Sequence, residues 1–283
     1  MKHPRRNVTW FIIFFIFFLS CTPGHRIRLH PQAVRAPVPL LQAHAHNDYW
    51  HERPLLDALE NGFTSIEADI FLIDDQLLVA HDKENVRPDR TLESLYLQPL
   101  WNKVRKNGGR VYPGWPTLTL LIDIKSDADS TYRVLKKTLQ NYRAMLTHFS
   151  DAKIKEGAVT VIVSGNRPIE MMKTEQLRLA GYDGRIGPDM EKSAFLVPLI
   201  SDKWTDYFTW MGKGDMPAAE QAKLAQIVDK AHATGKRLRF WATTDKPTEA
   251  RTRLWEKLMQ MKVDLISTDD LEGLKEFLLH YSE

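Results

Sequence analysis

The sequence predicts an α/β fold, namely a TIM (β/α)8 barrel formed by a single domain. Short apolar runs alternate with helical stretches along most of the 283 residues, as in a parallel sheet whose strands are joined by helices. Prolines and glycines mark where these helices begin and end. With 43% hydrophobic residues, the chain can bury one large core without a second domain.

The predicted strands are short apolar runs bounded by polar or turn-forming residues. They are residues 41–46, 64–72, 118–124, 158–164, 185–187, 238–243 and 264–268. A shorter run at residues 76–81 is expected to pair with the second strand or to continue it. The sixth strand is expected within residues 195–212, where the pattern does not define its ends.

The predicted helices lie between these runs, at residues 54–61, 92–106, 131–148, 168–180, 217–234, 247–261 and 271–279. Several begin with a proline, which the first helical turn tolerates: Pro54, Pro168, Pro217 and Pro247. Several end at a glycine, which suits a left-handed C-terminal residue: Gly62, Gly108, Gly181 and Gly235. An open doubly wound sheet is the competing fold, but a glycine-rich phosphate loop would then usually follow the first strand, where this chain has His-Asn-Asp.

Residues 1–20 are predicted to be a signal peptide. Arg5 and Arg6 precede an apolar run at residues 8–19, which is too short to span a bilayer as a helix. The only cysteine, Cys21, follows at once, and this resembles a bacterial lipobox with Phe18 in place of its usual leucine-type residue. The resemblance implies lipidation of Cys21 and export to a bacterial cell envelope, with the membrane as a partner through this anchor. A plain secretory signal or an uncleaved anchor is the alternative.

Residues 21–40 are expected to be a lipid-anchored tether, because they are rich in proline and arginine and contain no acidic residue. The barrel is then predicted to span residues 41–283. The formal charge of +3 comes from Lys2, Arg5 and Arg6, and the rest of the chain has 36 basic and 36 acidic residues. This balance gives no electrostatic case for nucleic acid as a partner.

Glu67 and Asp69 suggest a metal site, because residues two apart on a strand point to the same face. Two carboxylates directed into a core are costly unless a cation neutralises them, and oxygen ligands favour Mg²⁺ or Ca²⁺. Asp123 follows an apolar run and would complete a site of three carboxylates, while Lys125 could balance charge or hold a phosphate oxygen. A solvated strand edge and a buried Asp–Lys pair without a ligand are the structural alternatives.

Three histidines stand where strands are expected to end. His44 and His46 alternate at the end of the first run, and His81 ends the run that follows the second strand. The carboxyl ends of barrel strands are where such enzymes place catalytic groups. A single histidine there is more often structural, but three near three carboxylates favour a catalytic site.

The chain resembles the glycerophosphodiester phosphodiesterase-like superfamily of PLC-like phosphodiesterases. The resemblance rests on five segments in order: AHAHNDYW, ALENGFTSIEADIFLIDDQLLVAHD, LLIDIK, RFWATTDKP and VDLISTDD. HNDYW followed by RPL is similar to the branch typified by the fungal altered inheritance of mitochondria protein 6. These segments span residues 43–270, so the resemblance covers nearly all of the predicted barrel.

The resemblance implies roles for residues that match its motifs. It implies metal ligation by Glu67, Asp69 and Asp123, and acid–base catalysis by His46 and His81. The familiar diesterases carry His-Arg-Gly where this chain has His-Asn-Asp, and a glutamate where it has Asp123, as in the sphingomyelinase D-like relatives. These departures concern the substrate more than the reaction class.

Four further residues are expected to contact substrate: His44, Lys125, Trp241 and Arg167. Trp241 matches a tryptophan of the family at the end of the seventh strand, although packing in the core is the alternative. Arg167 could contact phosphate or could lie in solvent. His44 could instead support a neighbouring side chain.

The expected function is a metal-dependent phosphodiesterase acting on glycerophosphodiesters or phospholipid head groups. One histidine would deprotonate water or a neighbouring substrate hydroxyl, and the other would protonate the leaving alkoxide. Attack by the substrate hydroxyl would give a cyclic product first. The alternative is a catalytically silent barrel that binds lipid or phosphate at the cell surface. A sugar-processing barrel would instead show a carboxylate pair without paired histidines.

Overall fold

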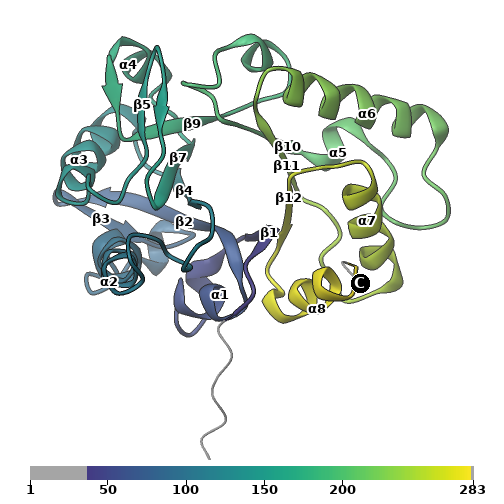
Figure 1. The fold of residues 1–283 in the computed structure, drawn as a ribbon, viewed down its shortest axis with the longest axis horizontal. Coiled ribbons are helices and arrows are strands. Elements are labelled where there is room, and N and C mark those ends of the chain that lie inside the picture. Colours follow the sequence, from purple (N-terminus) through teal and green to yellow (C-terminus); the bar gives the residue numbers. More distant parts are fainter. Residues whose placement is uncertain (1–36, 282–283) are drawn as a thin grey trace, which may run out of the picture. The chain divides into compact units, whose positions relative to one another are not determined.

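The computed structural model describes residues 37–281, which form a closed barrel of parallel strands surrounded by helices (Figure 1). The eight barrel strands are β1 (Leu40–Ala45), β2 (Phe63–Ile73), β4 (Leu118–Ile124), β7 (Val159–Gly165), β9 (Ala180–Gly184), β10 (Leu199–Lys203), β11 (Arg237–Trp241) and β12 (Leu265–Thr268). Each pairs in parallel with its neighbours, and β1 closes the ring by pairing with both β2 and β12. The predicted TIM barrel is therefore confirmed.

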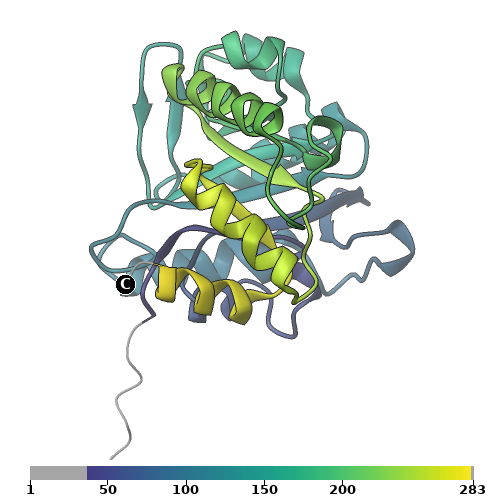
Figure 2. The same cartoon turned by 90° about the vertical axis from the view of Figure 1, so that its right-hand side faces the viewer.

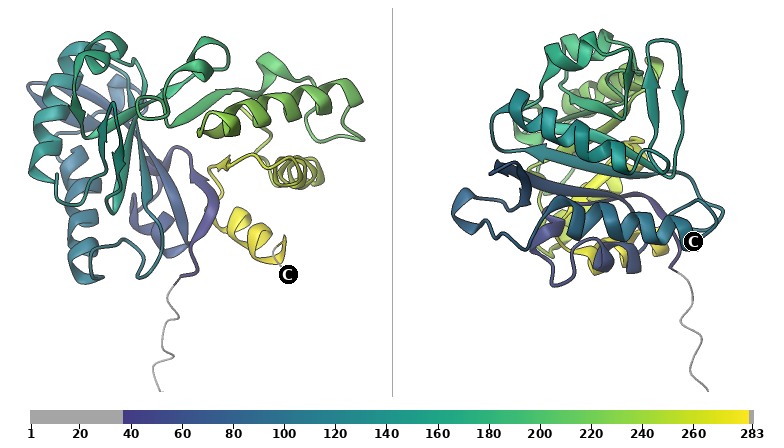
Figure 3. Two further views of the ribbon diagram at one scale, coloured as in Figure 1. Left: turned by 45° about the horizontal axis from the view of Figure 1, so that its top comes forward. Right: turned by 90° about the vertical axis from the view of Figure 1, so that its left-hand side faces the viewer.

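The α-helices of the described residues lie outside this ring. They are α1 (Leu56–Glu60), α2 (Gln98–Lys106), α3 (Ala128–Asn141), α4 (Ile169–Thr174), α5 (Trp204–Tyr207), α6 (Ala218–Ala233), α7 (Glu249–Gln260) and α8 (Leu271–Tyr281). Figure 2 shows α6, α7 and α8 along the outside of the last strands, and Figure 3 shows α2 and α3 on the side of the first strands.

Four short strands stand outside the ring. β3 (Gln76–Val79) pairs antiparallel with the end of β2, so the run at residues 76–81 pairs with the second strand rather than continuing it. β5 (His148–Ser150), β6 (Ile154–Lys155) and β8 (Leu177–Arg178) form a small antiparallel sheet. This sheet lies in segments that the sequence pattern assigned to helices or left open.

Alternate residues of the barrel strands belong to two separate apolar layers. The outward residues, such as Ile66, Ala68 and Ile70 on β2, join the main core beneath the helices. The inward layer is small and consists of one aliphatic side chain from each of β4, β7, β10 and β12: Leu121, Ile162, Leu199 and Leu265. We call these four residues the aliphatic layer. Barrel interiors are packed in such layers of side chains, so this layer divides the interior into a carboxyl end and an amino end.

The third predicted helix, at residues 131–148, starts earlier and ends earlier than expected. α3 begins after Asp127, whose carboxylate accepts a hydrogen bond from the Ser130 backbone N–H at 3.0 Å. This N-cap satisfies a helix donor that has no partner within the helix. Residues 142–145 form turns instead, and β5 begins at His148.

The predicted helix at 168–180 and strand at 185–187 are also corrected. α4 ends at Thr174, and the barrel strand β9 occupies residues 180–184. Gly181 is not a helix cap, because a Cβ there would lie 2.6 Å from the Pro198 side chain. Glycine at this position permits close packing of β9 against the next segment. The sixth strand, β10, lies within the predicted interval of residues 195–212.

The predicted signal peptide at residues 1–20 and nearly all of the tether at residues 21–40 lie outside the described residues. Both stay predictions. Among residues 37–281, none of the helices has the length and apolar character needed to cross a membrane.

Candidate active site

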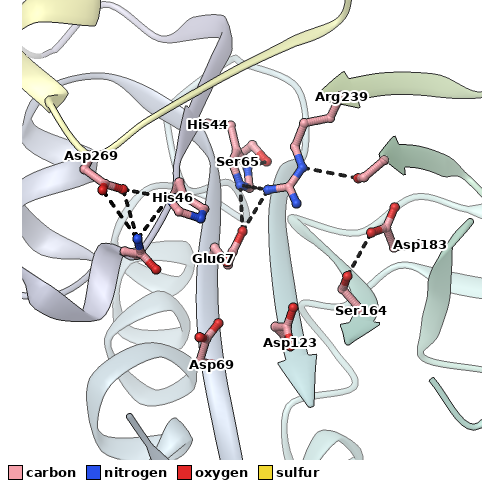
Figure 4. Close-up of polar contacts among 12 residues, drawn as sticks. His44, His46, Ser65, Glu67, Asp69, Asp123, Ser164, Asp183, Arg239 and Asp269 are labelled. Atoms are coloured by element: carbon pink, nitrogen blue, oxygen red, sulfur yellow. Dashed lines mark hydrogen bonds and ion pairs between the residues drawn. The ribbon is translucent and has the colours of Figure 1, made fainter. Parts of the chain in front are cut away.

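Three carboxylates meet at the carboxyl end of the barrel, above the aliphatic layer (Figure 4). Glu67 and Asp69 come from β2, and the parallel register places Asp69 directly beside Asp123 of β4. One oxygen from each of the three lies within 4.8 Å of the others. The sequence alternation therefore brought together the three residues expected to form a metal site.

Two cations partly neutralise these carboxylates. Lys125 Nζ lies 3.0 Å from Asp69 Oδ2 and 3.1 Å from Asp123 Oδ1. Arg239 of β11 donates a hydrogen bond of 2.7 Å to Glu67 Oε2. Burial would raise the pKa of Glu67, but the charge of Arg239 and the contacts with His44 and His46 together outweigh it and hold the pKa well below its usual range. Asp69 differs, because burial and the nearby Glu67 raise its pKa to about 6 despite Lys125.

The carboxylates suit a hard divalent cation. Asp69 Oδ1 is buried and has no hydrogen-bond partner, so an oxygen ligand remains available. Burial also raises the pKa of Asp123, which means that an added positive charge would stabilise its ionised form. Gly165 makes room for the Asp123 carboxylate, since a Cβ at Gly165 would clash with Asp123 Oδ1. The residues fit Mg²⁺ or Ca²⁺, both of which take oxygen ligands.

His46 stands at the end of β1, beside the metal candidates. Its Nδ1 donates to Asp269 Oδ1 at 2.7 Å, and Asn47 Nδ2 donates to the same oxygen at 3.2 Å. Burial alone would lower the pKa of His46, but the hydrogen bond to Asp269 and the charges of Glu67 and Asp269 raise it. Nε2 of His46 has no hydrogen-bond partner within residues 37–281 and is left for a ligand.

His81 follows β3, and a carboxylate also holds its ring. Its Nδ1 lies 3.2 Å from Asp69 Oδ2 and 2.9 Å from the Tyr49 hydroxyl, which in turn lies 2.6 Å from Asp69 Oδ2. When Tyr49 donates to Asp69, its oxygen can accept the Nδ1 proton of His81. Nε2 of His81 again has no partner in the described part of the chain. The ring of exposed Trp50 lies 5.2 Å from the His81 ring, centre to centre.

His44 is fully buried and supports this site from below. Arg239 contacts its Nε2, and its Nδ1 lies 2.7 Å from Ser65 Oγ. Arginine can only donate, so Nε2 accepts and Nδ1 carries the proton. Burial, followed by the charge of Arg239, lowers the pKa of His44 to about 3, so its ring is neutral. The structure therefore places His44 against Glu67 and Arg239 with no exposed surface for substrate.

Lys125 is part of the site, whereas the two remaining predicted substrate contacts lie to one side. Arg167 donates to the Asp183 carbonyl at 2.6 Å and lies 3.7 Å from the Asp189 carboxylate. Trp241 ends β11, and Lys203 Nζ lies 5.9 Å from its ring centre. Among the described residues, neither Arg167 nor Trp241 contacts the three carboxylates.

Sequence reasoning missed three residues that hold the site: Tyr49, Asp269 and Arg239. Asp269 follows β12 directly, and this position at the carboxyl end of a strand is a usable signal. Tyr49 comes three residues after His46 in the same segment. Arg239 is two residues before Trp241, so the alternation of a strand places both on one face.

Comparison with known proteins identifies a family and several relatives. The model of the AIM6-like phosphodiesterase domain matches residues 32–111 and 110–183. An altered inheritance of mitochondria protein 6 homolog from Arthroderma benhamiae is 28% identical over 87% of this chain and 86% of its own length. The altered inheritance of mitochondria protein 6 of Eremothecium gossypii is 32% identical over 91% of this chain and 74% of its own length. That of Lachancea thermotolerans is 30% identical over 82% of this chain and 64% of its own length.

These relatives overturn one expectation from the sequence. All three come from fungi, so the predicted location in a bacterial cell envelope is wrong. The lipobox match depended on Cys21 following a short apolar run, and such a pattern arises easily in an apolar segment. Cys21 itself lies outside the described residues.

Proposed function

This chain belongs to the AIM6-like phosphodiesterase domain family, and we propose that it is a metal-dependent phosphodiesterase. The proposed substrates are glycerophosphodiesters or phospholipid head groups. One observation carries the proposal: three carboxylates converge beside two imidazoles, each of which has Nδ1 held by a carboxylate and Nε2 without a hydrogen-bond partner among residues 37–281. A site that only bound phosphate would not need two oriented imidazoles beside the carboxylates.

Glu67, Asp69 and Asp123 are the proposed ligands of Mg²⁺ or Ca²⁺. A bound divalent cation would polarise a non-bridging phosphate oxygen and neutralise developing charge. Lys125 Nζ lies between Asp69 and Asp123. With a cation bound to these two carboxylates, Lys125 would be available to pair with a phosphate oxygen instead. Trp50 and Trp241 offer flat apolar surfaces at this end of the barrel for the alcohol portions of the substrate.

His46 is the proposed general acid. Asp269 raises the pKa of His46, so its ring holds a proton that Nε2 can give to the leaving alkoxide. His81 is the proposed general base, with Nε2 taking the proton of water or of a neighbouring substrate hydroxyl. Tyr49 and Asp69 orient the His81 ring through Nδ1, and Asp269 does the same for His46. His44 and Arg167 are then positioning residues, on Glu67 and on the loop near Asp183 respectively.

A panel of phosphodiesters tests this function directly. We expect turnover of at least one glycerophosphodiester or lysophospholipid with Mg²⁺ or Ca²⁺, and none with EDTA. His81→Ala should reduce turnover by about 10²–10⁴-fold, the usual range for an acid–base group, while His148→Ala, a partly buried histidine on β5, should not. Thermal melts of both variants control for folding. Turnover that EDTA does not change would remove the metal from the mechanism, and no turnover on any diester would favour a silent phosphate-binding barrel.

A further inference from the structure

A second hollow lies at the amino end of the barrel, on the other side of the aliphatic layer. Its volume is about 330 Å³, and three members of the aliphatic layer line it, namely Ile162, Leu199 and Leu265. Phe149 and Ile154 of the small antiparallel sheet add apolar wall. The site above the layer is rich in charge, whereas this hollow is mainly apolar.

Two of its lining residues are charged: Arg237 and the exposed Glu156. Arg237 of β11 lines this hollow and also an adjoining one of about 480 Å³. Its guanidinium donates to Thr119 Oγ1 at 3.3 Å and to the Leu41 carbonyl at 3.2 Å, both long hydrogen bonds. A guanidinium has five N–H donors, so most of its donor capacity stays unused.

Arg237 forms no ion pair within residues 37–281, although burial lowers its pKa. The acidic group that affects it, Asp264, is already engaged by His232 at 2.9 Å and by the Leu238 backbone N–H at 2.8 Å. Arg239, two residues further along β11, shows the normal arrangement, since Glu67 neutralises it at 2.7 Å (Figure 4). The Arg237 side chain is partly exposed, and a guanidinium that is partly removed from water and has no ion pair would gain from a bound anion.

We propose that the hollow binds a small anionic amphiphile. Its carboxylate or phosphate head would pair with Arg237, and its apolar chain would lie against Phe149, Ile154 and the aliphatic layer. The segment at residues 22–36 is a poor candidate for filling the hollow. It contains three arginines and no acidic residue that could neutralise Arg237. This site goes beyond the proposed phosphodiesterase activity. The hollow is separate from the carboxylate site. Thr119, which lines the hollow, lies four residues before Asp123 on β4, a distance of about 13 Å along the strand at the usual rise per residue.

Calorimetry with three probes tests the proposal on the full chain in EDTA: octanoate, octyl phosphate and octanol. We expect octanoate or octyl phosphate to bind at least about tenfold more tightly than octanol, because a charge-assisted hydrogen bond contributes that much. Whichever head binds more tightly identifies the source, fatty carboxylate or monoalkyl phosphate. Equal affinity for octanol, or no binding of any probe, would overturn the proposal.

Variants locate the binding. Arg237→Met should weaken binding at least about tenfold and Arg237→Lys should retain most of it, as expected for a charge contact. Arg110→Gln is the matched control, because Arg110 donates to Thr117 and the Gly157 carbonyl nearby without lining the hollow. If Arg237→Met fails to fold, Ile154→Ser at the exposed rim should still weaken octanoate binding several-fold. Unchanged binding in Arg237→Met or Ile154→Ser would reject the site. The measurement involves no turnover, so its failure leaves the phosphodiesterase proposal untouched.

Discussion

The two ends of the barrel interior differ in charge although the same eight strands build both. At the carboxyl end, Glu67, Asp69 and Asp123 outnumber the cations that neutralise them, Lys125 and Arg239. At the amino end, Arg237 forms no ion pair among the described residues, and it lines a hollow with apolar side chains, threonines and the exposed Glu156. The difference teaches that one strand can serve two opposite sites. Arg237 and Arg239 are two residues apart on the inward face of β11, but each lines the site on a different side of the aliphatic layer.

The largest expected effect is on turnover at the carboxyl end. Asp123→Asn removes one negative charge from the proposed metal site and should reduce turnover on the order of 10³-fold, since a bound metal contributes several kcal/mol. Arg110→Gln removes one charge near the amino end and should leave turnover unchanged. Equal losses of turnover in the two variants would contradict the comparison, because the amino end would then affect catalysis as much as the carboxyl end does. Steady-state kinetics with saturating Mg²⁺ or Ca²⁺ measures this, with a thermal melt of each variant.

A second prediction concerns pH and stability at the carboxyl end. Burial raises the pKa of Asp48 to about 7, although the Leu55 backbone N–H and the Tyr96 hydroxyl donate to it. The folded state therefore holds this proton more tightly than the unfolded chain, so the stability it contributes is full below pH 4 and is lost as the pH rises to about 7. At 1.36 kcal/mol per pKa unit, the loss is roughly 4 kcal/mol.

Asp48→Asn should remove this part of the pH dependence, because the amide does not titrate. Urea unfolding from pH 4 to pH 8 measures the free energy of unfolding for both proteins in the same metal-free buffer. Asp229→Asn, an exposed change on α6, is the control and should keep the pH dependence of the original protein. A variant curve parallel to the original would mean that Asp48 ionises normally.

A smaller effect is expected from the partner of His46. Asp269→Asn keeps the shape but removes the charge that raises the pKa of His46. If protonated His46 is the general acid, the alkaline limb of the kcat profile should move to lower pH, and kcat should fall about tenfold to a hundredfold. The pH profile of kcat measures this, with Asp229→Asn as control. A lower kcat with an unshifted alkaline limb would argue against His46 as the acid.

The smallest expected effect comes from a glycine. Gly165→Ala places a Cβ against Asp123 Oδ1 and should weaken metal binding by about tenfold, equivalent to about 1.4 kcal/mol. Gly108→Ala is a matched control, because Gly108 has φ of 68° against 65° for Gly165, but a Cβ added at Gly108 would meet no atom within 4 Å. Calorimetric titration with Mg²⁺ and Ca²⁺ compares the two. Similar affinities in the two variants would show that the contact with Asp123 does not weaken metal binding.

The sequence predicted the carboxyl end much better than the amino end, for a physical reason. Alternation along β2 put Glu67 and Asp69 on one face, and parallel pairing then put Asp123 beside Asp69, so local pattern was sufficient. Asp269 pairs with His46 because β12 pairs with β1 and closes the barrel. These strands are far apart in the sequence, so no local pattern predicts the contact.

The partners of a side chain at the amino end depend on its height along the barrel axis. The alternation of residues along a strand predicts which face a side chain takes, but not this height. Arg237 and Arg239 have the same side chain and the same strand face, yet only Arg239 reaches a carboxylate. Gly181 was misassigned for a related reason. In the sequence it resembles the glycine at the end of a helix, but glycine is needed there because Pro198, in a neighbouring segment, packs closely against it.

The aliphatic layer also has a consequence for how the barrel folds. Leu121 and Ile162 belong to the first four strands of the barrel, and Leu199 and Leu265 belong to the last four. Neither half can complete this layer alone, so each loses apolar burial when the other unfolds. The two halves should therefore unfold in one cooperative transition rather than as independent units.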